Sequence, residues 1–224
     1  MRELSLLEAR ALGVLIEKAH TVPDSYPLSL NALVSGCNQK TAREPVLNAT
    51  EAEVQMAVDA LKGLSLAFES SGSRVSRYEH NLGRALGLPS QSVALLAVLM
   101  LRGPQTSAEL RASCERLHRF ADVSSVDAFL VELAERAPEK GGPLVVRLPR
   151  AAGSREPRWA HLLCGAVDAA ALAMPADAGD FVAASELAAL RAHQSAMQAE
   201  IDTLRALVER LYTELGVTRE QRAD

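Results

Sequence analysis

The chain has 224 residues, of which 48% are hydrophobic and 23% charged, and this is enough apolar material for one or two cores. Its formal charge of −4 is unevenly distributed, because residues 166–224 hold five Lys and Arg against ten Asp and Glu while the preceding part is nearly neutral. Charged residues interrupt the apolar stretch of residues 1–20, which excludes a signal peptide or a membrane span there, so we expect a cytoplasmic protein with no membrane partner.

The first half of the sequence predicts three helices followed by a β-hairpin. Apolar residues recur at helical spacing over residues 4–19, 28–37 and 51–64, and Thr50 is a candidate N-cap for the third helix. The run Leu66–Glu69 is compatible with a strand, and Gly and Ser residues then separate it from a second extended segment that ends near Leu82.

The second half predicts the same order of elements. After Gly87-Leu88-Pro89, helical patterns cover residues 90–102, 106–117 and 124–136. Thr106, followed by Glu109, is typical of a capping box, and Ser124 is the candidate start of the last helix. The strand-compatible run 144–147 is then followed by a turn and a further extended segment.

An internal repeat relates the two predicted hairpins. At an offset of 81 residues, Gly72–Leu82 matches Gly153–Leu163 in six of eleven positions without a gap. The shared residues include a Gly-Ser-Arg string, a second arginine and a histidine, and Tyr78 is replaced by Trp159. Such self-similarity predicts two copies of one structural unit.

Three helices and a hairpin, repeated, follow the plan of the winged helix-turn-helix domain. We therefore predict a mainly α fold with small β-hairpin wings, an α+β class in which two winged helix-turn-helix domains are followed by a C-terminal coiled-coil helix. The expected boundaries are 1–86 and 87–166 for the two winged-helix domains, 167–180 for a linker, 181–216 for the coiled-coil helix and 217–224 for a disordered tail.

The C-terminal segment has a heptad pattern, because apolar residues from position 187 onward step alternately by three and four. β-branched residues at two a positions and leucines at d favour a parallel pair of helices, so we expect a homodimer. An amphipathic helix that folds back on its own chain is the alternative. The residues expected to form the dimer contact are Leu190, Met197, Ile201, Leu204, Val208 and Leu211.

Several strings in this chain resemble the YceH-like family of bacterial proteins, over almost its whole length. They are Leu6-Leu7-Glu8-Ala9-Arg10, Cys37-Asn38-Gln39-Lys40, Arg43-Glu44-Pro45-Val46, Ser73-Arg74-Val75, Arg102-Gly103-Pro104-Gln105-Thr106, Glu109-Leu110-Arg111, Arg155-Glu156-Pro157-Arg158 and His161-Leu162-Leu163. The resemblance implies a tandem winged-helix fold and a DNA-binding or regulatory role that rests on that fold. It implies no catalytic residues.

The sequence offers no arrangement typical of an enzyme, a metal site or a cofactor site. The five histidines are far apart, the three cysteines are widely spaced, and neither set has zinc-ligand spacing. Nucleotide-binding glycine motifs and a nucleophile elbow are also missing from the sequence. We therefore expect a non-enzymatic protein with no cofactor and no metal, in which the cysteines are small buried hydrophobes.

Nucleic-acid binding is expected at the wings rather than at the helices. The helices 51–64 and 124–136, which would enter a major groove, are both net acidic, and acidic residues repel phosphates. The candidate phosphate-binding residues lie in the wings and in the loop after the second helix: Arg74, Arg77, Arg147, Arg150, Arg155, Arg158, Lys40 and Arg43. Alternatively, the wing arginines pair with local carboxylates such as Glu79 and Glu156.

Two functions remain open from the sequence. The first is a dimeric DNA-binding or transcription-regulator-like protein that uses its wing arginines. The second is an adaptor that binds another protein on a tandem winged-helix scaffold and does not bind DNA. A fold by itself does not choose between them.

Overall fold

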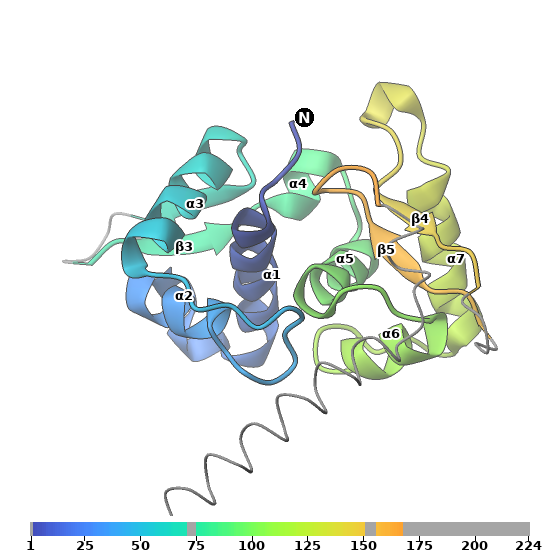
Figure 1. The fold of residues 1–224 in the computed structure, drawn as a ribbon, viewed down its shortest axis with the longest axis horizontal. Helices are drawn as coiled ribbons and strands as arrows, with labels where there is room; N and C mark the ends of the chain where they lie inside the picture. Colours follow the sequence, from blue (N-terminus) through green and yellow to red (C-terminus); the bar gives the residue numbers. More distant parts are fainter. Residues whose placement is uncertain (1, 71–74, 151–155, 168–224) are drawn as a thin grey trace, which may run out of the picture. The chain divides into compact units, whose positions relative to one another are not determined.

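The computed structural model describes residues 2–70, 75–150 and 156–167, all of which lie in one compact unit, Met1–Ala173. These residues form seven α-helices, two short 3-10 helices and five short strands in two antiparallel sheets, so the chain is of the α+β class (Figure 1). None of the described helices is both long enough and apolar enough to cross a membrane. The predicted linker from residue 168 onward, the coiled-coil helix with its six contact residues and the tail lie outside the described residues.

The first half forms three helices and a three-stranded sheet. Its elements are α1 (Leu6–Thr21), the 3-10 helix η1 (Pro23–Ser25), β1 (Leu28–Ser29), α2 (Leu30–Cys37), α3 (Glu51–Gly63), β2 (Ala67–Ser70) and β3 (Arg77–His80). The strand order is β1-β3-β2, with Leu28 opposite Tyr78 and Phe68 opposite Glu79. The predicted hairpin is confirmed, whereas β1, with only two residues, is too short to have a sequence pattern of its own.

The second half repeats this order with a smaller sheet. The helix α4 (Leu82–Leu86) ends at Gly87, and the elements that follow are α5 (Ser90–Arg102), α6 (Ser107–Cys114), α7 (Val123–Ala134), η2 (Pro138–Lys140), β4 (Val145–Arg147) and β5 (Trp159–His161). Gly87 has a φ of 64°, a left-handed conformation that suits glycine at the end of a helix. The predicted three helices followed by a hairpin are found in both halves, whereas the short strand β1 and the short helix α4 were not predicted.

Short polar side chains determine where the helices begin. Thr50 and Thr106 cap α3 and α6, and in each case a glutamate three residues later completes a capping box. The start predicted for α7 was wrong by two residues. Asp122, not Ser124, is its N-cap, because the Asp122 carboxylate accepts the Ser125 backbone N–H at 2.7 Å and thereby satisfies a helix-terminal donor.

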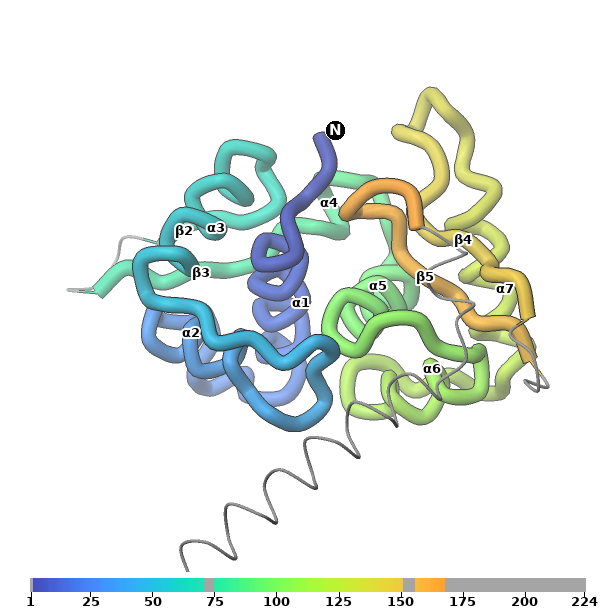
Figure 2. Tube along the Cα trace, in the orientation of Figure 1, coloured from blue at the N-terminus to red at the C-terminus, as the bar shows by residue number. Residues whose placement is uncertain are grey.

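One hydrophobic core joins the two halves. Helix α1 lies between α3 and α5 in Figure 1, and Figure 2 shows the traces of α1 and α5 side by side. Fully buried leucines on both helices, such as Leu12, Leu15 and Leu95, belong to the same cluster. The backbone N–H of Glu44 also donates to the carbonyl of Leu101 at 2.8 Å, so the loop after α2 is fastened to the end of α5. Cys37 and Cys114 lie in this core as expected, while Cys164 is only half-buried.

The close packing of α2 on α1 gives a first prediction. A methyl group added at Gly36 would lie 2.5 Å from Cγ1 of the fully buried Val14, far inside van der Waals contact. We expect Gly36→Ala to lower the free energy of unfolding by about 1–3 kcal/mol, measured by urea denaturation. Gly63→Ala is the matched control, because nothing lies within 4 Å of its added methyl group, and a similar loss in both variants would contradict the explanation.

Candidate nucleic-acid interface

The second hairpin is hydrogen-bonded along both edges of β5. On one edge Arg147 is opposite Trp159, and the Leu148 N–H donates to the Arg158 carbonyl at 2.8 Å. On the other edge the Trp159 N–H donates to the Gln105 carbonyl at 2.7 Å, and the Gln105 N–H donates back at 3.1 Å. The buried indole of Trp159 anchors the hairpin. Side chains at this end are therefore carried on a well-supported backbone.

Three of the predicted phosphate-binding residues belong to this hairpin. Arg147, Arg150 and Arg158 are all exposed, and none of them forms an ion pair within the described part of the chain. The guanidinium carbon of Arg147 lies 5.8 Å from the centroid of the Trp159 ring, a cation–π geometry that orients the side chain. Arg155 lies outside the described residues. The sequence did not reveal the contact between Arg147 and Trp159, because it joins opposite strands.

The first hairpin has one arginine, Arg77, among the described residues. Arg77 is exposed, but its Nη1 donates to the Pro27 carbonyl at 2.8 Å, which holds the side chain along the sheet edge. Its ion pair with Glu79, the alternative from the sequence, is not found among the described ion pairs. Arg74 lies outside the described residues. Among the described residues, the first hairpin therefore carries one exposed arginine and the second hairpin carries three.

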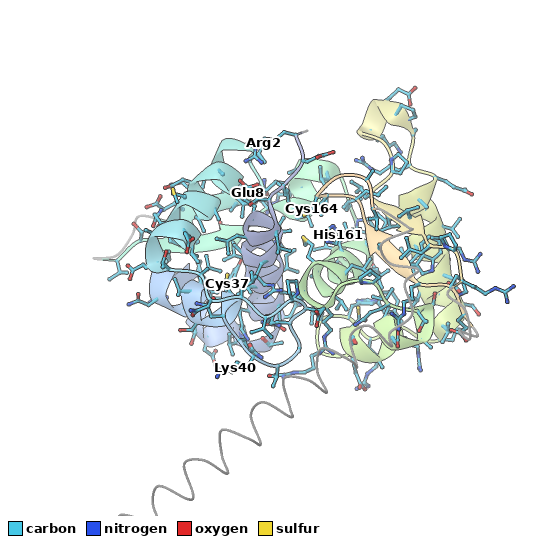
Figure 3. The ribbon with its side chains drawn as sticks, viewed as in Figure 1. Arg2, Glu8, Cys37, Lys40, His161 and Cys164 are labelled. Atoms are coloured by element: carbon cyan, nitrogen blue, oxygen red, sulfur yellow. The ribbon has the colours of Figure 1, made fainter. Side chains whose placement is uncertain are left out.

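The two predicted phosphate-binding residues in the loop after α2 have different surroundings, because Lys40 is exposed and Arg43 is buried. Lys40 is exposed at the outer edge of the loop, as Figure 3 shows. Arg43 is buried, and its Nη1 and Nη2 donate to the two Glu17 carboxylate oxygens at 3.1 and 2.6 Å while Nε donates to the Gly36 carbonyl at 3.1 Å. Burial acts to raise the pKa of Glu17, but the hydrogen bonds and charge of Arg43 outweigh it and the pKa is lowered. Arg43 thus fastens the loop to α1 and is not available to a phosphate.

A second buried arginine supports the same loop and was missed by the sequence reasoning. Arg10 on α1 is fully buried, and it donates to the carbonyls of Cys37 and Pro45 at 3.1 and 2.6 Å. Both acceptors are backbone atoms more than twenty residues away in sequence, so no pattern in the sequence predicts these two hydrogen bonds. Together Arg10 and Arg43 position the loop that carries Lys40.

The exposed faces of α3 and α7 are acidic in the structure as well as in the sequence. On α3, Glu51, Glu53 and Asp59 are exposed, and Lys62 is bound to Asp59 and Glu69. On α7 the exposed charged residues are Asp127 and Glu132, and Glu135 follows at the C-cap. These faces present carboxylates where a recognition helix would approach the phosphates of a duplex.

The repeated histidines are half-buried. His80 on β3 and His161 on β5 each have a buried Nδ1 without a hydrogen-bond partner in the described residues, and Figure 3 labels His161. Burial lowers the pKa of both imidazoles to about 4, with a smaller contribution from the nearby His20 in the case of His80. Both rings are therefore neutral near pH 7 and add no positive charge to the hairpins.

Comparison with known proteins places this arrangement in a family. The family model described as "Protein of unknown function, DUF480" matches residues 4–154. A UPF0502 protein of Burkholderia multivorans (strain ATCC 17616 / 249) is 62% identical over 226 residues, which cover 100% of this chain and 94% of the relative. A UPF0502 protein of Leptothrix cholodnii (strain ATCC 51168 / LMG 8142 / SP-6) is 61% identical over 219 residues, which cover 96% of this chain and 97% of the relative. The resemblance to YceH-like proteins is consistent with these matches, and the chain belongs to the DUF480 (UPF0502) family of uncharacterised bacterial proteins.

Proposed function

We propose that this chain is a non-enzymatic tandem winged-helix protein that binds DNA through the backbone phosphates, chiefly with its second hairpin. The observation that carries the proposal is the group of exposed arginines, Arg147, Arg150 and Arg158, which have no carboxylate partner within the described residues. Arginine on a hairpin suits phosphate contact and insertion into a minor groove. The repeated order of three helices and a hairpin supports the winged-helix interpretation.

The acidic helix faces determine the mode of binding that we propose. Carboxylates on α3 and α7 would repel a duplex placed along these helices, so the hairpin approaches the DNA and the helices stay away from it. Contacts of this kind read shape and charge more than base sequence. A homodimer through the predicted coiled coil, which is a further part of the proposal, would present two such hairpins and raise the avidity for DNA.

The salt dependence of binding tests the proposal. We expect the full chain to bind a random DNA duplex at about 50 mM salt, and the slope of log affinity against log salt to reflect about 0.9 per phosphate contacted. The variant Arg150→Ala with Arg158→Ala should flatten that slope by roughly 1.8 and weaken binding. The measurement is fluorescence anisotropy at several salt concentrations, after circular dichroism has shown that each variant is folded.

A charge-matched control separates a local contact from a change in net charge. Arg84→Ala with Lys140→Ala removes the same two charges from exposed positions on α4 and η2, outside the hairpin. This double variant should keep the wild-type slope. An equal change of slope in both double variants, or undetectable binding by the wild type at low salt, would contradict the proposal.

A second function, that of a protein-binding adaptor, is favoured by one observation on α3. The side chain of Met56 is 64% exposed on the face that also carries Glu51, Glu53 and Asp59. An exposed methionine adapts to different apolar partners, and the surrounding carboxylates would attract a basic segment. If the wild-type protein does not bind the duplex, this face of α3 becomes the leading candidate for the functional surface.

A further inference from the structure

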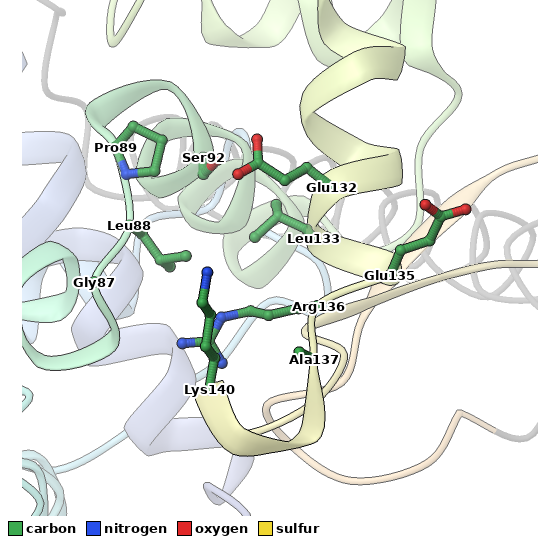
Figure 4. A pocket seen from close by; sticks show the side chains of 10 residues that line it. All are labelled: Gly87, Leu88, Pro89, Ser92, Glu132, Leu133, Glu135, Arg136, Ala137 and Lys140. Atoms are coloured by element: carbon green, nitrogen blue, oxygen red, sulfur yellow. The ribbon is translucent and has the colours of Figure 1, made fainter.

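A pocket of about 340 Å³ lies on the second half of the described chain, away from the hairpin strands. One wall is the link between α4 and α5, with Leu88 and Pro89, and the other is the end of α7, Ala137 and the last residue of η2, Lys140 (Figure 4). Its volume falls at the lower end of the range for small-molecule sites in proteins. The charged and polar groups in it are distributed unevenly.

Two cations occupy one end of the pocket. The Arg136 Nη2 donates to the Leu86 carbonyl at 2.6 Å, and Nη1 is 3.5 Å from the Gly142 carbonyl, so backbone oxygens hold the guanidinium in place. In the view of Figure 4 the Lys140 side chain runs past the Arg136 guanidinium, and its ammonium group lies between that guanidinium and Glu132. Within the described residues, neither Arg136 nor Lys140 has a carboxylate oxygen within 4.0 Å. This end therefore has an uncompensated positive charge.

A carboxylate and a hydroxyl occupy the other end. Figure 4 shows the Glu132 side chain directed toward Ser92, whereas the carboxylate of Glu135, which also lines the pocket, is turned away from Ser92. Ser92 is only 1% exposed and lines this end of the pocket. Leu88 and Leu133 lie between the two ends.

We propose that this pocket binds a small zwitterion of the size of an amino acid. Its anionic group would lie at Arg136 and Lys140, where two positive charges are available. Its ammonium group would lie at Glu132, with the Ser92 hydroxyl as a further hydrogen-bonding partner. A simple anion would be repelled by Glu132 and a simple cation by the two basic residues, so the charge pattern selects a molecule that carries both signs. The two leucines supply an apolar contact between the charged ends.

The proposal is tested by thermal unfolding of the full chain in the presence of each of the twenty common L-amino acids at about 10 mM. An amino acid at ten times its Kd should raise the Tm by about 3 °C or more. Acetate and ethylamine at the same concentration, which carry only one of the two charges, should leave the Tm within about 1 °C of its value in buffer. The binding does not depend on the DNA-binding proposal, because the readout contains no nucleic acid.

Three variants locate the effect in the pocket. Lys140→Met removes one of the two cations and should reduce the Tm increase that the amino acid produces in the wild type, and Glu132→Gln removes the carboxylate and should abolish it. Glu139→Gln is the matched control, because Glu139 is exposed on η2 and does not line the pocket, and it should retain the increase. The proposal is overturned if no amino acid raises the Tm, if acetate or ethylamine raises it equally, or if Lys140→Met and Glu132→Gln respond as the wild type does.

Discussion

Replacing Arg43 by alanine should lower the free energy of unfolding by about 3–5 kcal/mol. The Arg43 side chain is completely buried and forms a two-point ion pair with Glu17, at 2.6 and 3.1 Å. Removing it leaves the mostly buried Glu17 carboxylate with only the Lys18 ammonium, 3.1 Å from Oε2, as a partner, and it also leaves the Gly36 carbonyl without the Nε donor. A loss of this size is a large part of the stability of an ordinary domain. Urea denaturation of the full chain measures it.

Two further variants separate the loss of the buried ion pair from the loss of a positive charge in the loop. Lys40→Ala removes a positive charge from the same loop, but at an exposed position, and should change the free energy of unfolding by no more than about 0.5 kcal/mol. Arg43→Met combined with Glu17→Met replaces the pair by apolar side chains and should recover most of the loss. If Arg43→Ala costs less than about 1 kcal/mol, the ion pair does not fasten the loop to α1 as described.

Stability should fall steeply between pH 7.5 and pH 5 because of His80 and His161. Burial lowers the pKa of both imidazoles from the usual 6.5 to about 4 in the folded protein. As the pH falls below 6.5, the unfolded chain takes up protons at these residues while the folded chain does not, so the equilibrium moves toward the unfolded state until the pH nears 4. At pH 5 the expected loss is about 2 kcal/mol per histidine relative to pH 7.5.

The variants His80→Gln and His161→Gln test this explanation one residue at a time. Each should lose about half of the pH-dependent fall in the free energy of unfolding, measured by denaturant titration at pH 7.5 and pH 5. His118→Gln is the matched control, since His118 lies against the edge of Phe120 rather than in a repeat hairpin, and it should keep the full fall. The carboxyls with a lowered pKa, such as Glu8 and Glu17, lose their stabilising contribution mainly below this pH window. A flat profile in the wild type would contradict the prediction.

The helices and hairpins could be predicted because local signals determine them. Capping boxes at Thr50 and Thr106 are readable three residues apart, and apolar spacing indicates which helix faces are buried. The α7 start was misplaced because Asp122, Ser124 and Ser125 are all plausible caps, and only the hydrogen bonds distinguish them. The predicted coiled coil remains a prediction, since it lies outside the described residues.

Whether a basic side chain is buried or exposed could not be predicted, because this depends on contacts between distant parts of the chain. Arg43 and Lys40 are neighbours in one loop, yet Arg43 is buried because Glu17 lies 26 residues earlier on α1, at the right place to receive it. The pocket has the same origin, since Ser92 and Lys140 belong to separate helices that the fold brings together. The sequence around an arginine does not show whether its side chain is buried and holds a loop in place or is exposed and able to bind a partner.

The packing of α1 against α5 determines whether the two halves of the chain can exist as separate domains. Gly13 on α1 faces Leu101 on α5 so closely that an added methyl group would lie 2.9 Å from its Cγ, and the leucines around this contact belong to one core. Although the repeat suggests two independent units, the apolar face that each half contributes to this contact is buried only by the other half. Cutting the chain at Gly87 would expose the inner faces of both helices to water, and the separated halves would tend to aggregate rather than persist as free domains.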